Sequence, residues 1–107
     1  MNTGSDKIFK AVADQTRRDI IALLQSSPDT LSIKDIASQF NISRQGITKH
    51  LDILEEANLV KTRVQGRDRL CYVDLRPLKH IDQWIENYRV FWRHKLDDLG
   101  DYLDGKK

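Results

Sequence analysis

The chain has 107 residues, a length that fits a single domain. Its 18 Lys and Arg residues nearly balance 16 Asp and Glu residues, so the net charge of +2 does not by itself indicate a nucleic-acid partner. The sequence shows no apolar run near the ~20 residues that a membrane span needs, no signal-peptide core and only one cysteine, Cys71. We therefore expect a cytoplasmic protein without disulfides and without a membrane partner.

Two short helices are expected at the start of the chain. The first would follow an N-cap at Ser5 and bury a face that includes Ile8. The second would be capped by Asp14 or Thr16, and its apolar residues recur one turn apart. Pro28 cannot continue a helix, so a turn is expected around it.

Residues 31–59 predict two further helices joined by a tight turn. Ser32 and Asp35 have the spacing of a capping box, and apolar residues follow at helical spacing from Ile33 to Phe40. Ser43 is a good N-cap for the next helix, expected over 43–57. The turn between the helices is only about three residues long, which is typical of a helix-turn-helix.

The expected helix 43–57 combines an apolar face with a crowded polar one. A helix-turn-helix inserts such a polar face into the DNA major groove. Its candidate DNA-contacting residues are Ser43, Arg44, Gln45, Thr48, Lys49 and His50. Gly46 costs a helix about 1 kcal/mol relative to alanine. Either the first helix or a DNA backbone passes close to Gly46, or the glycine is simply tolerated on an exposed face.

From residue 59 the apolar pattern changes to a period of two, which predicts a β-hairpin over 59–75 with its turn at Gly66, Arg67 and Asp68. A hairpin directly after such a helix is the wing of a winged helix. Its basic residues, Arg67 and Arg69 at the tip, with Arg63 and Lys61 as weaker candidates, suit a phosphate backbone or the adjacent minor groove. In isolation, a solvated charged hairpin would explain them equally well.

The last element is expected to be one long helix over 76–104, because Pro77 suits a first helical turn and apolar residues recur in steps of three and four. A domain this small cannot cover so long an aromatic stripe, so the stripe predicts a symmetric dimer. The alternative is that the helix folds wholly onto its own domain. The candidate interface residues are Ile8, Leu78, Ile81, Trp84, Ile85, Tyr88, Phe91, Trp92 and Leu99.

The sequence predicts a mostly α-helical fold with a small β-hairpin. It would be a winged helix-turn-helix with an N-terminal helix and a long C-terminal dimerisation helix. Residues 1–107 would form one domain, with a DNA-binding core at 5–75, the wing at 59–75 and the dimerisation helix at 76–104.

These motifs resemble the ArsR family of bacterial winged-helix repressors. IFKAVADQTRRDIIALL is similar to the opening of that family, with Gln15 where proline is usual. LSIKDIASQFNISRQGITKHLDILEEANLVKTRVQGRDRLCYVDL is similar to its helix-turn-helix and wing. The family's Ser-Lys-His-Leu combination stands here as Thr48-Lys49-His50-Leu51. The resemblance covers roughly residues 6 to 75 closely, and the terminal helix fits in kind.

The resemblance implies DNA binding, and it raises the question of metal sensing. The family's thiolate site needs a cysteine pair in the first helix of the helix-turn-helix, and LSIKDIASQF has none. Its other common site uses Asp and His on one terminal helix with His and Glu or His on the other. Here Asp82 and Glu86 are one turn apart and His80 and His94 are fourteen residues apart, so neither spacing is reproduced. We expect the metal-independent branch, with no metal and no cofactor.

The sequence predicts a sequence-specific regulator of transcription. A homodimer would bind double-stranded operator DNA at an inverted repeat. It would also repress its own operon, as members of the metal-independent branch often do. A metal- or redox-responsive repressor, using His80 and His94 across a dimer or Cys71, is one alternative. A winged helix that serves as a protein-interaction module is another. An enzyme is not expected, because no nucleophile–base pair, phosphate loop or paired carboxylates stand out.

Overall fold

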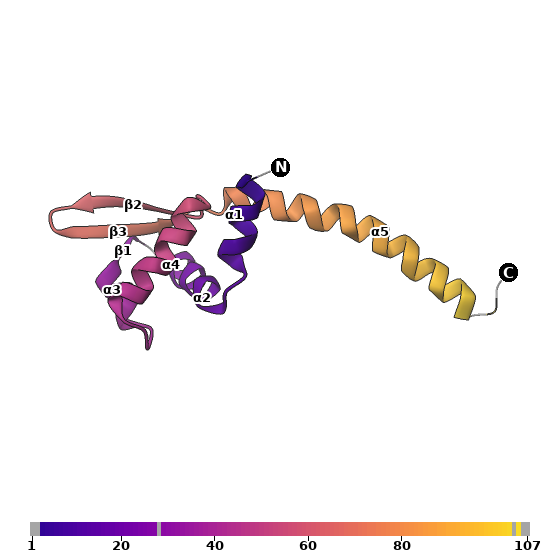
Figure 1. Ribbon diagram of the computed structural model, residues 1–107, viewed down its shortest axis with the longest axis horizontal. Coiled ribbons are helices and arrows are strands. Elements are labelled where there is room, and N and C mark those ends of the chain that lie inside the picture. Colours follow the sequence, from indigo (N-terminus) through magenta and orange to yellow (C-terminus); the bar gives the residue numbers. More distant parts are fainter. Residues whose placement is uncertain (1–2, 28, 104, 106–107) are drawn as a thin grey trace.

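Five α-helices, a 3₁₀ turn and a three-stranded sheet make up the computed structural model, which describes residues 3–27, 29–103 and 105. Figure 1 shows the first four helices and the sheet gathered in one body, from which the last helix projects. The molecule therefore extends 70 Å along its longest axis and 30 Å and 24 Å along the others. The helices are α1 (Thr3–Val12), α2 (Gln15–Ser26), α3 (Ile33–Ser38), α4 (Arg44–Glu56) and α5 (Lys79–Leu103).

Local side-chain caps begin three of these helices. Asp14 accepts a hydrogen bond from the backbone N–H of Arg17 at 3.1 Å, so Asp14 rather than Thr16 caps α2. Ser32 and Asp35 form the predicted capping box of α3. Ser43 accepts from the N–H of Gly46 at 3.0 Å and begins α4.

The structure changes the predicted boundaries of α1 and α3. Helix α1 already includes Thr3, so Ser5 lies inside its first turn and the N-cap prediction for Ser5 was wrong. Helix α3 ends at Ser38, so Phe40 lies beyond it and packs against the core from the turn. Helix α2 ends at Ser26, and the expected turn residue Pro28 lies outside the described residues, as does residue 104 of the last expected helix.

The end of α4 is a Schellman motif, in which two backbone N–H groups satisfy carbonyls of the last turn. The N–H of Leu59 donates to Leu54 at 3.0 Å, and that of Asn58 donates to Glu55 at 2.9 Å. Asn58 takes the left-handed conformation that this motif needs, with φ 62°. The chain therefore turns sharply from α4 into the wing.

The predicted hairpin is confirmed, with β2 (Val60–Gln65) paired antiparallel to β3 (Asp68–Val73). Its turn is shorter than predicted, because Asp68 already pairs with Gln65. Gly66 has φ 63°, a conformation that glycine adopts without steric cost. A third strand, β1 (Leu31–Ser32), adds to the other edge of β3 and gives the sheet order β1-β3-β2.

The hydrophobic core lies between α1, α2, α3, α4 and the roots of the strands. It includes Ile20, Ile36, Leu51 and Leu54, all with 0 % exposure. Cys71 is also fully buried, and this burial raises the pKa of its thiol to about 11. A neutral, inaccessible thiol suits a packing role.

Gly46 lies where the turn between α3 and α4 presses on the first turn of α4. A Cβ atom there would come within 2.6 Å of the Cγ2 methyl of Ile42. The structure therefore excludes a side chain at position 46. The neighbour that excludes it is the turn residue Ile42, whereas the explanations offered from the sequence were the first helix, a DNA backbone or simple tolerance of glycine.

Gly46→Ala is expected to lower the free energy of unfolding by about 1–2 kcal/mol, because overpacking outweighs the gain of about 1 kcal/mol in helix propensity. Urea unfolding measures the change. Gly100→Ala in α5 is the control, because no atom lies within 4 Å of a Cβ there, and its stability should rise. An unchanged or more stable Gly46→Ala protein would contradict the crowding.

Helix α5 follows a 3₁₀ turn, η1 (Arg76–Leu78), that contains Pro77. Its 25 residues extend about 38 Å at 1.5 Å per residue. No residue of α5 is buried, and its aromatic side chains remain largely open to solvent. None of the helices in the described part of the chain has the length and apolar content that crossing a bilayer requires.

Candidate nucleic-acid interface

The N-terminal half of α4 and the free end of the wing enclose one hollow of about 480 Å³. The start of α3 completes its wall. Six predicted DNA-contacting residues line it: Arg44, Gln45, Thr48, Lys49, Arg67 and Arg69. The structure therefore brings the helix and the wing tip together around one concave, cationic surface.

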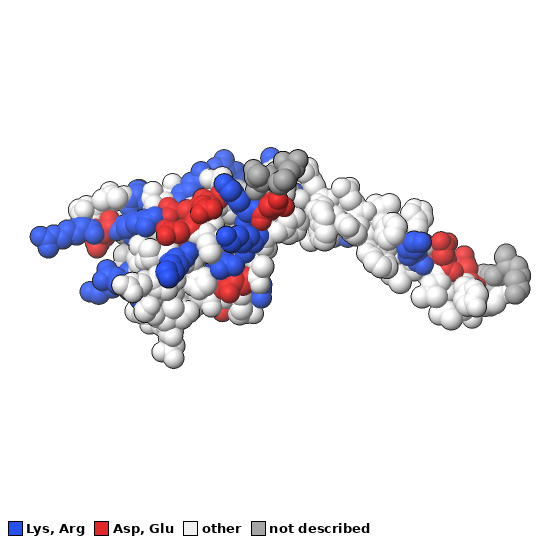
Figure 2. All heavy atoms as spheres, in the orientation of Figure 1, with Lys and Arg blue, Asp and Glu red and all other residues white. Residues whose placement is uncertain are grey.

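Lys34 also lines this hollow, and sequence analysis did not select it. It lies in the first turn of α3, between the two residues of the capping box. A lysine near the start of the first helix of a helix-turn-helix was the signal that could have found it. Figure 2 shows Lys and Arg side chains over the free end of the wing and beside it, whereas the middle of α5 is mostly uncharged.

The polar side chains of α4 differ in whether they already form hydrogen bonds within the protein. Arg44, Gln45 and Lys49 are exposed, and no hydrogen bond or ion pair to another described residue engages their side chains. The hydroxyl of Thr48 donates to the carbonyl of Arg44 at 2.9 Å, so its methyl group is the part that remains available. Ser43 is exposed but uses its hydroxyl to cap the helix.

Arg69 is engaged within the molecule. Its guanidinium forms an ion pair with Glu55 of α4, and Thr62 donates its hydroxyl to the same carboxylate at 2.9 Å. The side chain of Arg69 is only 36 % exposed. It therefore joins the wing to α4, and much of its charge is compensated there.

His50 faces the corner between α1 and α2. Its Nδ1 lies 3.2 Å from a guanidinium nitrogen of Arg17 and 3.9 Å from a carboxylate oxygen of Asp14. Arg17 also donates to the carbonyls of Ala11 at 2.9 Å and Lys10 at 2.8 Å. Because a guanidinium only donates, Nδ1 of His50 accepts and Nε2 carries the proton.

Asp14 of the same corner is an ionised acceptor. The hydrogen bond from the backbone N–H of Arg17, followed by the charge of the Arg17 guanidinium, lowers the pKa of Asp14. Arg17 thus ties the end of α1 to the second turn of α4, a role that no sequence pattern indicated.

The two remaining basic candidates lie on β2. Arg63 is exposed on this strand outside the hollow. Lys61 lies near the root of the wing, where its ammonium is 3.8 Å from Asp74. Of the two, only Arg63 has a side chain without a described partner.

The predicted dimer residues divide into two groups. Ile8 is 3 % exposed and belongs to the core of its own protomer, and Leu78 and Ile81 pack partly against that core. Ile8 therefore has almost no surface left for a partner. Further along α5, the others are 41–54 % exposed: Trp84, Ile85, Tyr88, Phe91, Trp92 and Leu99.

The exposed stripe of α5 begins against α1. The ring of Trp84 makes an edge contact with Phe9, with centroids 5.3 Å apart, and lies 4.5 Å from the ring of Tyr88. Phe9 thus extends the apolar surface onto α1, although sequence analysis had not placed it there.

In the part of the chain that the structure describes, no three His, Cys, Asp or Glu side chains converge to hold a metal ion. His80 and His94 both lie on α5, at its base and beyond its middle.

Comparison with known proteins places this geometry in a family. The helix-turn-helix domain family matches residues 12–63. The uncharacterized HTH-type transcriptional regulator YuzN of Bacillus subtilis is 39 % identical over 92 residues, covering 80 % of this chain and 100 % of the relative. The transcriptional repressor SdpR of the same species is 34 % identical, covering 78 % of this chain and 90 % of the relative.

Solved structures agree. The ArsR family transcriptional regulator RHA00566 superposes with a TM-score of 0.76 at 27 % identity, over 84 % of this chain and 91 % of the other. The homodimeric winged helix-turn-helix domain of Mb0332 from Mycobacterium bovis shares the fold, with a TM-score of 0.61 at 18 % identity over 89 % of this chain and 83 % of the other. The chain belongs to the ArsR family of winged helix-turn-helix transcriptional regulators, and it is a DNA-binding regulator and not an enzyme.

Proposed function

We propose that the protein is a homodimeric repressor that reads an inverted repeat through two copies of α4 and the wing. The observation that carries this proposal is the hollow in which Arg44, Gln45 and Lys49 of α4 face Arg67 of the wing tip. In this proposal, residues 5–75 form the DNA-binding core and 76–104 the dimerisation helix.

Base contacts would come from the exposed positions of α4. Arg44 is suited to a bidentate hydrogen bond with guanine, and Gln45 to one with adenine. Thr48 has its hydroxyl bonded to Arg44, so its methyl group would meet the methyl of thymine. These three residues would carry the sequence preference.

Phosphate contacts would surround these base contacts. Lys34, Lys49 and Arg67 lie around the hollow with free charges, and Arg63 lies further along the wing. The backbone N–H groups behind Ser43 add the positive end of the helix. Such contacts position a protein on any sequence and make its affinity depend on salt.

Arg69 and His50 would have supporting roles. Arg69 would hold the wing at a fixed angle to α4 through Glu55. His50 would present its Nε2–H to a phosphate while Arg17 holds the ring from behind. Both residues stay in the proposed site. Arg69 would orient the wing, and His50 would add one phosphate contact.

The dimer would form through the exposed face of α5 and Phe9. Monomers rarely leave an apolar stripe of this size uncovered. A two-fold dimer would place two α4 helices in successive major grooves on one side of the duplex, with half-sites about 10 bp apart. The homodimeric relative from Mycobacterium bovis supports this assignment.

The protein would belong to the metal-independent branch of its family. Helix α3 and the strand before it contain no cysteine, and Cys71 is buried with a raised pKa. His80 and His94 are separated by fourteen residues on one helix. Repression of its own operon is the simplest output for a protein of this kind.

A pair of arginine substitutions tests the groove. Arg44→Ala is expected to cost about 1–3 kcal/mol on the operator and little on random DNA, which reduces discrimination. Arg67→Ala should weaken all sequences alike and reduce the salt slope by about 1. Band-shift titrations at several salt concentrations, on operator and random duplexes, measure both quantities.

Lys10→Ala is the matched control, because Lys10 is an exposed cation on α1 outside the hollow. It should change neither discrimination nor the salt slope. If Arg44→Ala and Arg67→Ala both behaved like Lys10→Ala, the proposed groove contact would be wrong. The operator itself comes from selecting bound duplexes from a random pool.

A further inference from the structure

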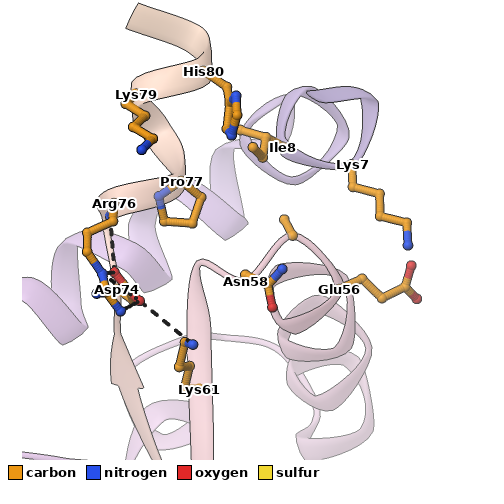
Figure 3. A pocket seen from close by; sticks show the side chains of 11 residues that line it. Lys7, Ile8, Glu56, Asn58, Lys61, Asp74, Arg76, Pro77, Lys79 and His80 are labelled. Carbon is orange, nitrogen blue, oxygen red and sulfur yellow. Dashed lines mark hydrogen bonds and ion pairs between the residues drawn. The ribbon is translucent and has the colours of Figure 1, made fainter. Parts of the chain in front are cut away.

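A second hollow, of about 490 Å³, lies at the opposite end of α4 from the DNA-contacting residues. Figure 3 shows its surroundings: Glu56 at the end of α4 with Asn58 just after it, Lys61 on β2, Asp74 just after β3, Pro77 in η1 and the base of α5. Helix α1 closes it from the remaining side. Residues of α1, α4, β2, η1 and α5 therefore meet at this one place.

The carboxylate inside this hollow is already neutralised. Asp74 accepts hydrogen bonds from the guanidinium of Arg76 at 2.7 and 2.9 Å, and the ammonium of Lys61 lies 3.8 Å away. These hydrogen bonds from Arg76 lower the pKa of Asp74 to about 2. The dashed lines in Figure 3 mark this three-residue network. It has one negative charge and two positive charges.

The other basic side chains around the hollow have no partner of this kind. Among the described residues, none forms a hydrogen bond or ion pair with the side chains of Lys7, Lys79 or His80. Glu56 is the one further carboxylate of the lining. With His80 neutral, four cations face two carboxylates, so the hollow has a surplus of two positive charges.

The lining also has the mixed character of a small-molecule site. Ile8, Ala57 and Pro77 contribute apolar surface, and Asn58 adds an amide group. Binding sites of this kind combine apolar walls with a few polar groups that fix orientation. The volume suits a small metabolite, and the charge suits an anion.

We propose that this hollow binds a small organic anion with phosphate or carboxylate groups, and that the anion regulates DNA binding. Lys79 and Lys7 would meet the anionic groups from α5 and α1, and Arg76 would contribute its remaining donors. A ligand there touches the end of the recognition helix, the root of the wing and the base of the dimerisation helix. Any difference in its affinity for the free and DNA-bound arrangements changes DNA affinity by the same factor.

The binding site is tested without DNA. Isothermal titration calorimetry of the full chain uses pyrophosphate in one arm and citrate in the other, with ionic strength held constant by NaCl. One site per chain is expected, and the tighter arm identifies phosphate or carboxylate chemistry. Lys79→Gln should raise the dissociation constant about tenfold, the usual weight of one charge-assisted contact. Lys7→Gln should act in the same direction.

Lys10→Gln is the matched control, because Lys10 is an exposed cation on α1 outside both hollows and its removal should leave anion binding unchanged. No saturable binding in either arm would overturn the proposal. So would equal losses in Lys79→Gln and Lys10→Gln, because they would indicate diffuse attraction to positive charge.

The regulatory part rests on the proposed function and has a separate readout. At an anion concentration just sufficient to saturate the wild-type protein, its operator affinity should change at least threefold, and that of Lys79→Gln, whose site is then only partly occupied, should change less. An unchanged affinity would overturn the regulatory role even if the anion binds. Failure of the anion-free protein to bind its operator would instead count against the proposed function alone.

Discussion

Trp84→Asp is expected to convert the protein to a monomer and to weaken operator binding by at least about 100-fold. The side chain of Trp84 is 48 % exposed on α5, where it continues the aromatic surface from Phe9 to Tyr88. A carboxylate there would have to be desolvated at a two-fold interface without a partner. Two linked α4 helices bind far more tightly than one, so losing the dimer removes most of the affinity. Sedimentation equilibrium and band shifts measure the two effects.

Ile85→Asp is the second variant, because Trp84 also contacts Phe9 and its replacement could loosen α1. Ile85 is 41 % exposed. Tyr72→Asp is the matched control, since Tyr72 is an equally exposed aromatic residue, at 41 %, on β3 and away from α5. If both α5 variants sedimented as dimers, the proposed interface would be wrong.

Leu51→Ala is expected to lower the free energy of unfolding by about 2–5 kcal/mol. Leu51 is completely buried on the inner face of α4, so truncation removes apolar contacts and leaves a cavity. A small domain has only about 5–15 kcal/mol of stability in total. Urea or thermal unfolding at a fixed protein concentration measures the loss.

Lys49→Ala, two residues earlier on the exposed face of the same helix, separates folding from DNA reading. Its stability should stay within about 0.5 kcal/mol of the wild type, while its affinity for all DNA sequences falls. Similar unfolding midpoints for Leu51→Ala and Lys49→Ala would mean that α4 does not have the buried and exposed faces described above.

Features decided within a few residues were predictable from the sequence. The caps at Asp14, Ser32 and Ser43 use side chains and backbone groups three positions apart, so their signature is local. The alternation of the wing is equally local. Strand β1 was not predictable, because two residues carry no pattern, and Leu31 pairs with Cys71 far along the chain.

The candidate site divides in the same way. Arg44 and Arg67 were selected by residue type and position, and both line the hollow. Residue type also selected Arg69 and His50, but the tertiary fold gives them the partners Glu55 and Arg17. Ile8 shows a related limit on predicting a dimer interface. In the sequence, an apolar helical face has the same pattern whether it packs on its own core or on a partner.

The 3₁₀ turn at Arg76–Leu78 determines the direction in which α5 leaves the body. Because α5 is about 38 Å long, a tilt of about 5° at its base would displace its far end by about 3 Å. In a two-fold dimer joined through α5, the same tilt would change the distance between the two DNA-binding cores. The half-site spacing that such a dimer could span would thus depend on a three-residue joint, and residues of this joint also line the hollow proposed to bind an anion.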